Sequence, residues 1–192
     1  MSQLRITAGS LRGRRVPVPA FDVRPTSERA RQAYFNIIGS DIQGAHFLDL
    51  FAGSGIFSFE AMSRGAKSAT AIDRDKWNAE GIKKQAATLG VPVNAMTGDV
   101  IAVLKRIKDP IDLVYADPPY DYDEYEKLVD AIETLQLSAE ATVAIEHRRG
   151  TKPFEALGPR PEALRVSRRA EYGEVWITFL RKTGTGITEE ED

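Results

Sequence analysis

Between residues 46 and 145, short apolar segments alternate with longer segments that have helical periodicity. Such an alternation builds βαβ units, whose parallel strands form one sheet covered by helices on both faces. The expected strands are residues 47–51, 68–72, 93–96, 113–116 and 142–145, and the expected helices are residues 57–63, 76–89, 100–107 and 122–135. The sequence therefore predicts an α/β fold with a doubly wound, mostly parallel sheet.

Both ends of the chain depart from this alternation. Residues 163–169 and 174–180 have no helix between them, so they predict an antiparallel hairpin that closes the sheet. Residues 4–7 and 14–18 predict a second hairpin, followed by an amphipathic helix that begins at Pro25-Thr26 and ends near Gly39. We expect an N-terminal extension over 1–40, a main domain over 41–182 and a disordered acidic tail over 183–192.

Composition excludes several classes of function. The chain has 192 residues, which is about the length of one domain. It has no cysteine and two histidines, so disulfides, a thiolate nucleophile and a zinc site are not expected, and we predict no metal. No apolar segment approaches the roughly 18 residues that a membrane span requires, and we expect a cytoplasmic, monomeric protein.

Basic charge is concentrated at the N-terminus. Residues 1–36 contain seven basic residues against the two acids Asp22 and Glu28, a balance of 7 − 2 = +5. All seven are arginines, whose planar fork suits phosphate: Arg5, Arg12, Arg14, Arg15, Arg24, Arg29 and Arg31. They predict a surface that binds nucleic acid, and the alternative is ordinary solvated charge.

A glycine loop follows the first strand of the alternating region. The segment from Asp49 through Phe51, Ala52, Gly53 and Ser54 to Gly55 leads from this strand into a helix. Small residues there let a ligand approach the backbone amides at the helix N-terminus. Ser58 stands where a dinucleotide fingerprint has its third glycine, and the Asp49 carboxylate would repel a pyrophosphate. A ligand with both carboxylate and ammonium groups, such as the amino-acid end of S-adenosylmethionine, fits better.

Two further acids follow the next strands. Asp73, with Arg74 after it, lies 20 positions beyond Gly53, the spacing at which an acid accepts hydrogen bonds from ribose hydroxyls. Asp99 and Val100 follow the third strand, where they could contact the amino group and the face of an adenine ring. Together with the loop, these residues predict a binding site for S-adenosylmethionine.

The fourth strand ends in Asp117-Pro118-Pro119-Tyr120. In a doubly wound sheet this strand lies beside the first, so the motif should face the glycine loop. Two prolines make the corner rigid, which fixes the Pro118 carbonyl beside the Asp117 carboxylate as two acceptors for an exocyclic amine. Tyr120 offers a flat face to a nucleobase that has left its stack. The corner is thus the predicted catalytic site, and the alternative is a rigid turn that caps a helix.

These motifs resemble those of class I S-adenosylmethionine-dependent methyltransferases, whose signature for amine substrates matches Asp117 to Tyr120. The arginine-rich N-terminus, the loop and Glu60 to Ala66 resemble the RsmD type of bacterial small-subunit rRNA guanine-N2 methyltransferase over about residues 5–180. The resemblance implies a seven-stranded sheet, S-adenosylmethionine as cofactor, and methylation of a guanine N2 amine in 16S rRNA, met free or within the small ribosomal subunit or its assembly intermediate.

Three other functions compete with this interpretation. An adenine-N6 methyltransferase acting on DNA or RNA could use the same corner, although the chain has no additional domain for reading DNA. A nicotinamide-dependent oxidoreductase is disfavoured by Ser58 and by the lack of an acid for hydride transfer. A non-catalytic RNA-binding module would leave Asp117 to Tyr120 without a purpose.

Overall fold

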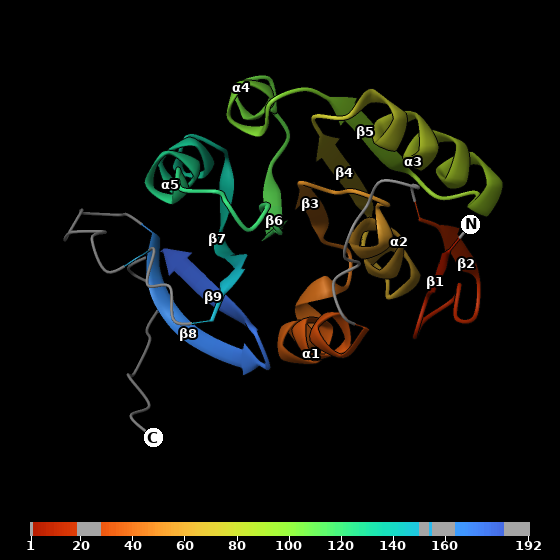
Figure 1. The fold of residues 1–192 in the computed structure, drawn as a ribbon, viewed down its shortest axis with the longest axis horizontal. Helices are drawn as coiled ribbons and strands as arrows, with labels where there is room; N and C mark the ends of the chain where they lie inside the picture. The colour runs from red at the N-terminus through yellow and green to blue at the C-terminus, as the bar shows by residue number, and fades with distance from the viewer. Residues whose placement is uncertain (1, 19–27, 150–153, 155–163, 183–192) are drawn as a thin grey trace.

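The computed structural model describes residues 2–18, 28–149, 154 and 164–182. Within them, seven strands form one sheet in the order β5-β4-β3-β6-β7-β9-β8 (Figure 1). The strands are β3 (His46–Leu50), β4 (Ser68–Asp73), β5 (Val93–Thr97), β6 (Ile111–Ala116), β7 (Leu137–Arg148), β8 (Leu164–Tyr172) and β9 (Val175–Lys182). β3 to β7 pair in parallel, whereas β9 pairs antiparallel with both β7 and β8. The predicted sheet and its closing hairpin are confirmed.

Helices cover both faces of this sheet. They are α1 (Glu28–Ile38), α2 (Ile56–Ser63), α3 (Lys76–Leu89), α4 (Val100–Leu104) and α5 (Tyr125–Glu133), and a 3-10 turn, η1 (Gly39–Ile42), follows α1. Side chains alternate along β3: Phe47 faces the core under α1, α2 and α3, whereas Leu48 and Leu50 face the core under α4 and α5. Because both faces are buried, the central strands β3 and β6 are mostly apolar.

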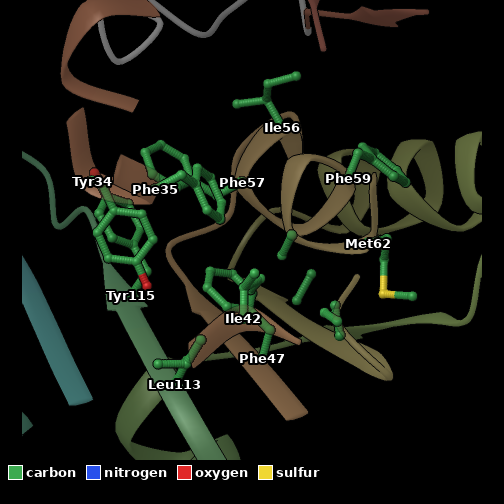
Figure 2. Close-up of a cluster of buried hydrophobic side chains, with 14 of the residues drawn as sticks. Tyr34, Phe35, Ile42, Phe47, Ile56, Phe57, Phe59, Met62, Leu113 and Tyr115 are labelled. Carbon is green, nitrogen blue, oxygen red and sulfur yellow. The ribbon is translucent and has the colours of Figure 1, made fainter. Parts of the chain in front are cut away.

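Aromatic rings join α1 to the sheet. Figure 2 shows Tyr34 and Phe35 of α1 beside Phe57 of α2 and Tyr115 of β6. The Phe57 and Tyr115 rings are stacked with centroids 3.8 Å apart, and Tyr34 meets Tyr115 edge-on at 4.9 Å. Each of these four rings is at most 4% exposed. The predicted N-terminal helix therefore shares its core with the main sheet.

The N-terminal hairpin consists of β1 (Gln3–Arg5) and β2 (Arg15–Pro17), and it lies beside α2 and α3 (Figure 1). Its loop is fixed by Glu60 of α2, whose carboxylate accepts hydrogen bonds from the amides of Thr7 and Ala8 at 2.9 and 3.1 Å. Gly9 has φ +77°, and a Cβ there would lie 1.7 Å from the Ser63 carbonyl oxygen. Only glycine lets this loop approach the end of α2 so closely.

Several predicted boundaries differ from the structure. α4 ends at Leu104 and not at residue 107, and α5 begins at Tyr125 and not at residue 122. β7 has 12 residues where four were predicted. Its first residue, Leu137, pairs with Ile111 of β6, and the pairing resumes at Thr142 after a register shift. The predicted helix start at Pro25-Thr26 and the acidic tail lie outside the described residues.

Candidate functional site

One large cleft opens at the carboxyl ends of the parallel strands. Its cavity volume is about 1510 Å³, more than a single drug-sized ligand requires. The glycine loop, the ends of β4 and β5, the Asp-Pro-Pro-Tyr corner and one side of the N-terminal hairpin all contribute to its lining. Ligands of open α/β sheets bind at this edge, where the strand order reverses between β3 and β6.

The loop between β3 and α2 has an unusual backbone. Phe51, Gly53 and Gly55 all have left-handed conformations, with φ of 61°, 51° and 74°. Among the described residues, Phe51 is the one non-glycine residue with a positive φ. Such a conformation is energetically costly, so the surrounding structure must hold the backbone in it. A Cβ at Gly55 would lie 2.8 Å from Cγ1 of Ile82, so α3 packs directly on the loop. The loop is therefore closely packed against α3.

Asp49 lies beneath this loop. It is 2% exposed, and its Oδ2 accepts hydrogen bonds from the Ser58 amide at 3.0 Å and the Ser58 hydroxyl at 2.7 Å. Burial raises the pKa of the Asp49 carboxyl to about 7, against the opposing effect of the Ser58 hydrogen bonds. Asp49 thus holds the first turn of α2, which explains the serine at position 58, and it also lines the cleft.

Asp73 connects the loop to the end of β4. Its Oδ2 accepts a 2.7 Å hydrogen bond from the Gly53 amide, while Oδ1 accepts from the Asp75 amide at 2.8 Å. The Asn78 amide group donates to the same Oδ1 at 3.3 Å. Asp73 and Arg74 both line the cleft, so the predicted ribose acceptor also shapes the loop that it faces.

The ends of β5 and β6 form an aromatic pocket. Asp99 caps α4 by accepting a 2.9 Å hydrogen bond from the Ala102 amide, and Val100 is buried beside it. The ring of Phe51 meets Tyr122 edge-on at 5.3 Å. Tyr122 lines the same cleft, and its buried hydroxyl has no hydrogen-bond partner among the described residues. These side chains could enclose a flat heterocycle between apolar faces.

The Asp-Pro-Pro-Tyr corner lies beside the glycine loop. β6 pairs with β3, and the Asp117 amide donates to the Leu50 carbonyl at 3.3 Å. The Tyr122 amide donates to the Pro119 carbonyl at 2.9 Å, which closes the turn. Tyr120 is 55% exposed at the rim. Asp117, Pro118, Pro119 and Tyr120 all line the cleft, so the strand order brings the predicted corner and loop together.

Glu146 of β7 and Tyr122 are among the cleft side chains that sequence reasoning missed. Glu146 is 6% exposed, and the Tyr115 hydroxyl donates to its Oε2 at 2.6 Å. Burial, with the nearby Asp117 carboxylate, raises the pKa of Glu146 to about 8. A glutamate in the apolar run Thr142-Val143-Ala144-Ile145-Glu146 was the available signal. The underestimated length of β7 hid it.

The seven arginines predicted to bind RNA differ in their exposure to solvent. Five are exposed, four of them on the hairpin and one on α1: Arg5, Arg12, Arg14, Arg15 and Arg29. The prediction is wrong for Arg31, which is 0% exposed, donates to the Arg5 carbonyl at 2.9 Å and lies 3.6 Å from Glu60. Its charge balances a buried carboxylate and so cannot contact RNA. Arg24 lies outside the described residues.

Neither a metal cluster nor a membrane span is present in the described residues. They contain no group of three or more histidine, aspartate or glutamate side chains arranged to hold a metal ion. None of the helices in the part of the chain that the structure describes is long and apolar enough to cross a membrane.

Comparison with known proteins identifies relatives along almost the whole chain. The family model described as "Conserved hypothetical protein 95" matches residues 4–181. Ribosomal RNA small subunit methyltransferase D of Escherichia coli K12 is 35% identical over 147 residues, which cover 75% of this chain and 74% of that protein. The solved structure of the E. coli protein yhhF matches with a TM-score of 0.81 and 30% identity over 94% of this chain and 98% of that one.

A more distant structure supports the fold alone. The 16S rRNA methyltransferase RsmC of T. thermophilus, solved with AdoMet and guanosine, matches with a TM-score of 0.73 and 17% identity. The match covers 94% of this chain and 50% of that chain. The seven-stranded sheet is therefore that of the class I methyltransferases.

Proposed function

The chain belongs to the RsmD family of methyltransferases, and from this membership we propose that it methylates the N2 amine of a guanine in 16S rRNA, with S-adenosylmethionine as the methyl donor. One observation carries the proposal: Asp117 and Pro118 line the same cleft as the glycine loop. The proposed amine site and the proposed nucleoside site thus share one volume.

The residues around the loop fit S-adenosylmethionine. The Asp49 carboxyl, buried and lining the cleft, suits the ammonium group of an amino acid, which would lower the raised pKa of this carboxyl. Asp73 would accept from ribose hydroxyls, and Phe51, Val100 and Tyr122 would enclose the adenine with Asp99 near its amino group. Arg74 and the loop residues Ala52, Gly53, Ser54 and Gly55 complete the proposed cofactor site. When bound, S-adenosylmethionine supplies a methyl group on a positively charged sulfur.

The corner would hold the target amine. The Asp117 carboxylate and the Pro118 carbonyl would each accept one N2 hydrogen, which orients the nitrogen lone pair toward the loop. Pro119 keeps the turn rigid, and Tyr120, exposed at the rim, would stack on the base. Because alignment supplies the rate acceleration, no metal and no histidine are needed in this scheme.

The N-terminal hairpin would grip the RNA. Val16, Pro17 and Val18 line the cleft, and Arg15 is exposed directly before them. Phosphates of an RNA strand entering the cleft would therefore meet Arg5, Arg12, Arg14, Arg15 and Arg29. On this proposal residues 1–40 are an RNA-binding extension of the catalytic domain at 41–182.

An adenine-N6 activity is the alternative, because the corner accepts an amine without reading the ring that carries it. The experiment that separates the two uses tritiated S-adenosylmethionine with naked 16S rRNA, assembled small subunits and DNA, followed by digestion to nucleosides. We expect tritium in N2-methylguanosine from 16S rRNA or the subunit. Label in N6-methyladenosine, or in none of the three substrates, would contradict the proposal.

A further inference from the structure

Glu146 is the one buried carboxylate of the cleft lining, among the described residues, that the proposed reaction leaves unused. It lies on β7, next to the strand that carries the catalytic corner. The parallel register pairs Ala116 with Ile145, so Asp117 and Glu146 follow as neighbours at the carboxyl ends of the two strands. Adjacent strands are about 4.8 Å apart, which is less than the width of a purine. A base held at Asp117 therefore extends across the end of β7.

The hydrogen bonds of Glu146 are incomplete for a buried carboxylate. An ionised carboxylate offers about four lone-pair positions. Among the described residues, the Tyr115 hydroxyl is the one donor to Glu146, and it occupies Oε2. Glu60, which is also buried, accepts from two backbone amides, a hydroxyl and Arg64. The other oxygen of Glu146 is not among the fully buried, unpartnered atoms of the described residues, so it opens on the cleft, where a donor on a ligand can reach it.

The Watson–Crick edge of guanine presents two neighbouring donors, the N2 amine and N1–H. When the N2 hydrogens are directed at Asp117 and the Pro118 carbonyl, N1–H is the next group along the same edge. Glu146 is the next acceptor along the same edge of the sheet. Adenine and 2-aminopurine carry a lone pair at N1 and would face the carboxylate with acceptor against acceptor.

We propose that the Glu146 carboxylate accepts a hydrogen bond from N1–H of the target guanine and thereby selects guanine over purines whose N1 carries no hydrogen. This inference rests on the proposed guanine-N2 methylation. Tyr115 is then a positioning residue, because its hydroxyl occupies Oε2 and leaves Oε1 for the base.

The test replaces the target guanine by 2-aminopurine, which keeps the 2-amine but lacks N1–H. Wild-type protein should methylate guanine at least about 100-fold faster than 2-aminopurine, since a site built for a hydrogen bond rejects an analogue without it. In Glu146→Gln the amide can still accept from Tyr115, and its NH2 group can donate to N1 of 2-aminopurine. The guanine preference should therefore fall at least about tenfold. Glu140→Gln, exposed on the same strand, is the matched control.

A second measurement needs no variant. The titratable groups facing Glu146 are Tyr115 on β6, Asp117 directly after β6, and Tyr125 on α5. Asp117 contacts the 2-amine of both bases, so its titration cancels in the ratio of the two rates. Because the pKa of Glu146 is raised to about 8, its ionised fraction increases between pH 6 and pH 8. The preference of the wild type for guanine should rise about tenfold or more over this range.

Each result has one meaning. A preference that falls in Glu146→Gln and rises with pH in the wild type supports the role of Glu146. Should Glu146→Gln fold poorly, the wild-type pH series decides alone. An unchanged preference in folded Glu146→Gln, or a flat pH series, overturns the inference while N2-methylguanosine formation by the wild type leaves the proposed function intact. Absence of methylation by the wild type would instead contradict the proposed function.

Discussion

Two groups of buried acids in this protein differ in how many hydrogen-bond donors surround their carboxylates. Glu60, at the contact between α2 and the hairpin, is surrounded by Thr7, Ala8, Arg64 and Arg31. Asp49 and Glu146, which line the cleft, each accept hydrogen bonds from one residue, Ser58 and Tyr115, among those described. Burial raises the pKa of both cleft carboxyls, to about 7 and about 8. Glu60, with a full set of donors, stabilises the fold, whereas the unoccupied acceptor positions of Asp49 and Glu146 remain available to a ligand at a cost in stability.

The largest effect should come from the saturated carboxylate. Glu60→Ala removes the acceptor for the hairpin loop and leaves the fully buried Arg31 charge without its counterion. Removing one partner of a buried ion pair costs about 3–5 kcal/mol, and we expect thermal or urea unfolding to report a decrease of this size. Glu80→Ala, which removes an exposed acid paired with Lys83, is the control and should change little. A Glu60→Ala protein as stable as the wild type would break the comparison.

At the corner we expect a loss of activity without a loss of stability. Asp117→Ala should lower methyl transfer by about 100-fold or more, because one of the two acceptors that align the amine is removed. Folding and the stabilisation by S-adenosylmethionine should persist, since the proposed cofactor contacts lie on the loop, at the ends of β4 and β5, and at Tyr122, and do not include Asp117. Melting curves with and without S-adenosylmethionine check this, with NAD as the ligand that should give no shift. Asp121→Ala, at an exposed position beyond the corner, is the matched control and should retain activity. Full activity in Asp117→Ala would exclude the proposed alignment.

The arginines extend the contrast from acids to bases. A triple variant, Arg12→Ala with Arg14→Ala and Arg15→Ala, removes exposed charge from the hairpin and leaves the buried Arg31 in place. RNA affinity should fall at least about tenfold, and the slope of log K against log salt should decrease by about one for each phosphate that is no longer neutralised. Filter binding at several salt concentrations measures both quantities. Lys105→Ala with Arg106→Ala, exposed beyond the end of α4, is the control, and an equal decrease there would indicate nonspecific charge.

The sequence predicted the sheet and the position of the corner because both depend on local pattern. Alternating apolar segments specify βαβ units, and their order alone places the end of β6 beside the loop after β3. What it could not predict depends on long-range contacts. Arg31 carries the same signal as Arg29 two residues away, and only the docking of the hairpin onto Glu60 buries one and exposes the other. Glu146 reaches the cleft because β7 extends past the corner, a length that its flanking residues do not indicate.

The smallest expected effect is the pH dependence of stability that the buried Asp49 carboxyl causes. The pKa of Asp49 is raised from its ordinary value to about 7, so the folded protein binds a proton that the unfolded chain has released. Its contribution to stability is present at low pH and disappears as pH rises through about 7, at no more than about 1.4 kcal/mol per pH unit. Asp49→Asn can still accept from Ser58 but does not titrate.

The Asp49→Asn protein without ligand should therefore lose less stability than the wild type between pH 5 and pH 8. It should also bind S-adenosylmethionine more weakly, because the ammonium group no longer meets a counterion. Urea unfolding across this range, with calorimetric titration of S-adenosylmethionine, measures both consequences. Asp41→Asn, whose exposed side chain lies 3.5 Å from Arg181, controls for the removal of one acid. If the two variants show the same pH dependence as the wild type, Asp49 is an ordinary helix cap, and the distinction between saturated and unsaturated acids does not extend to the loop.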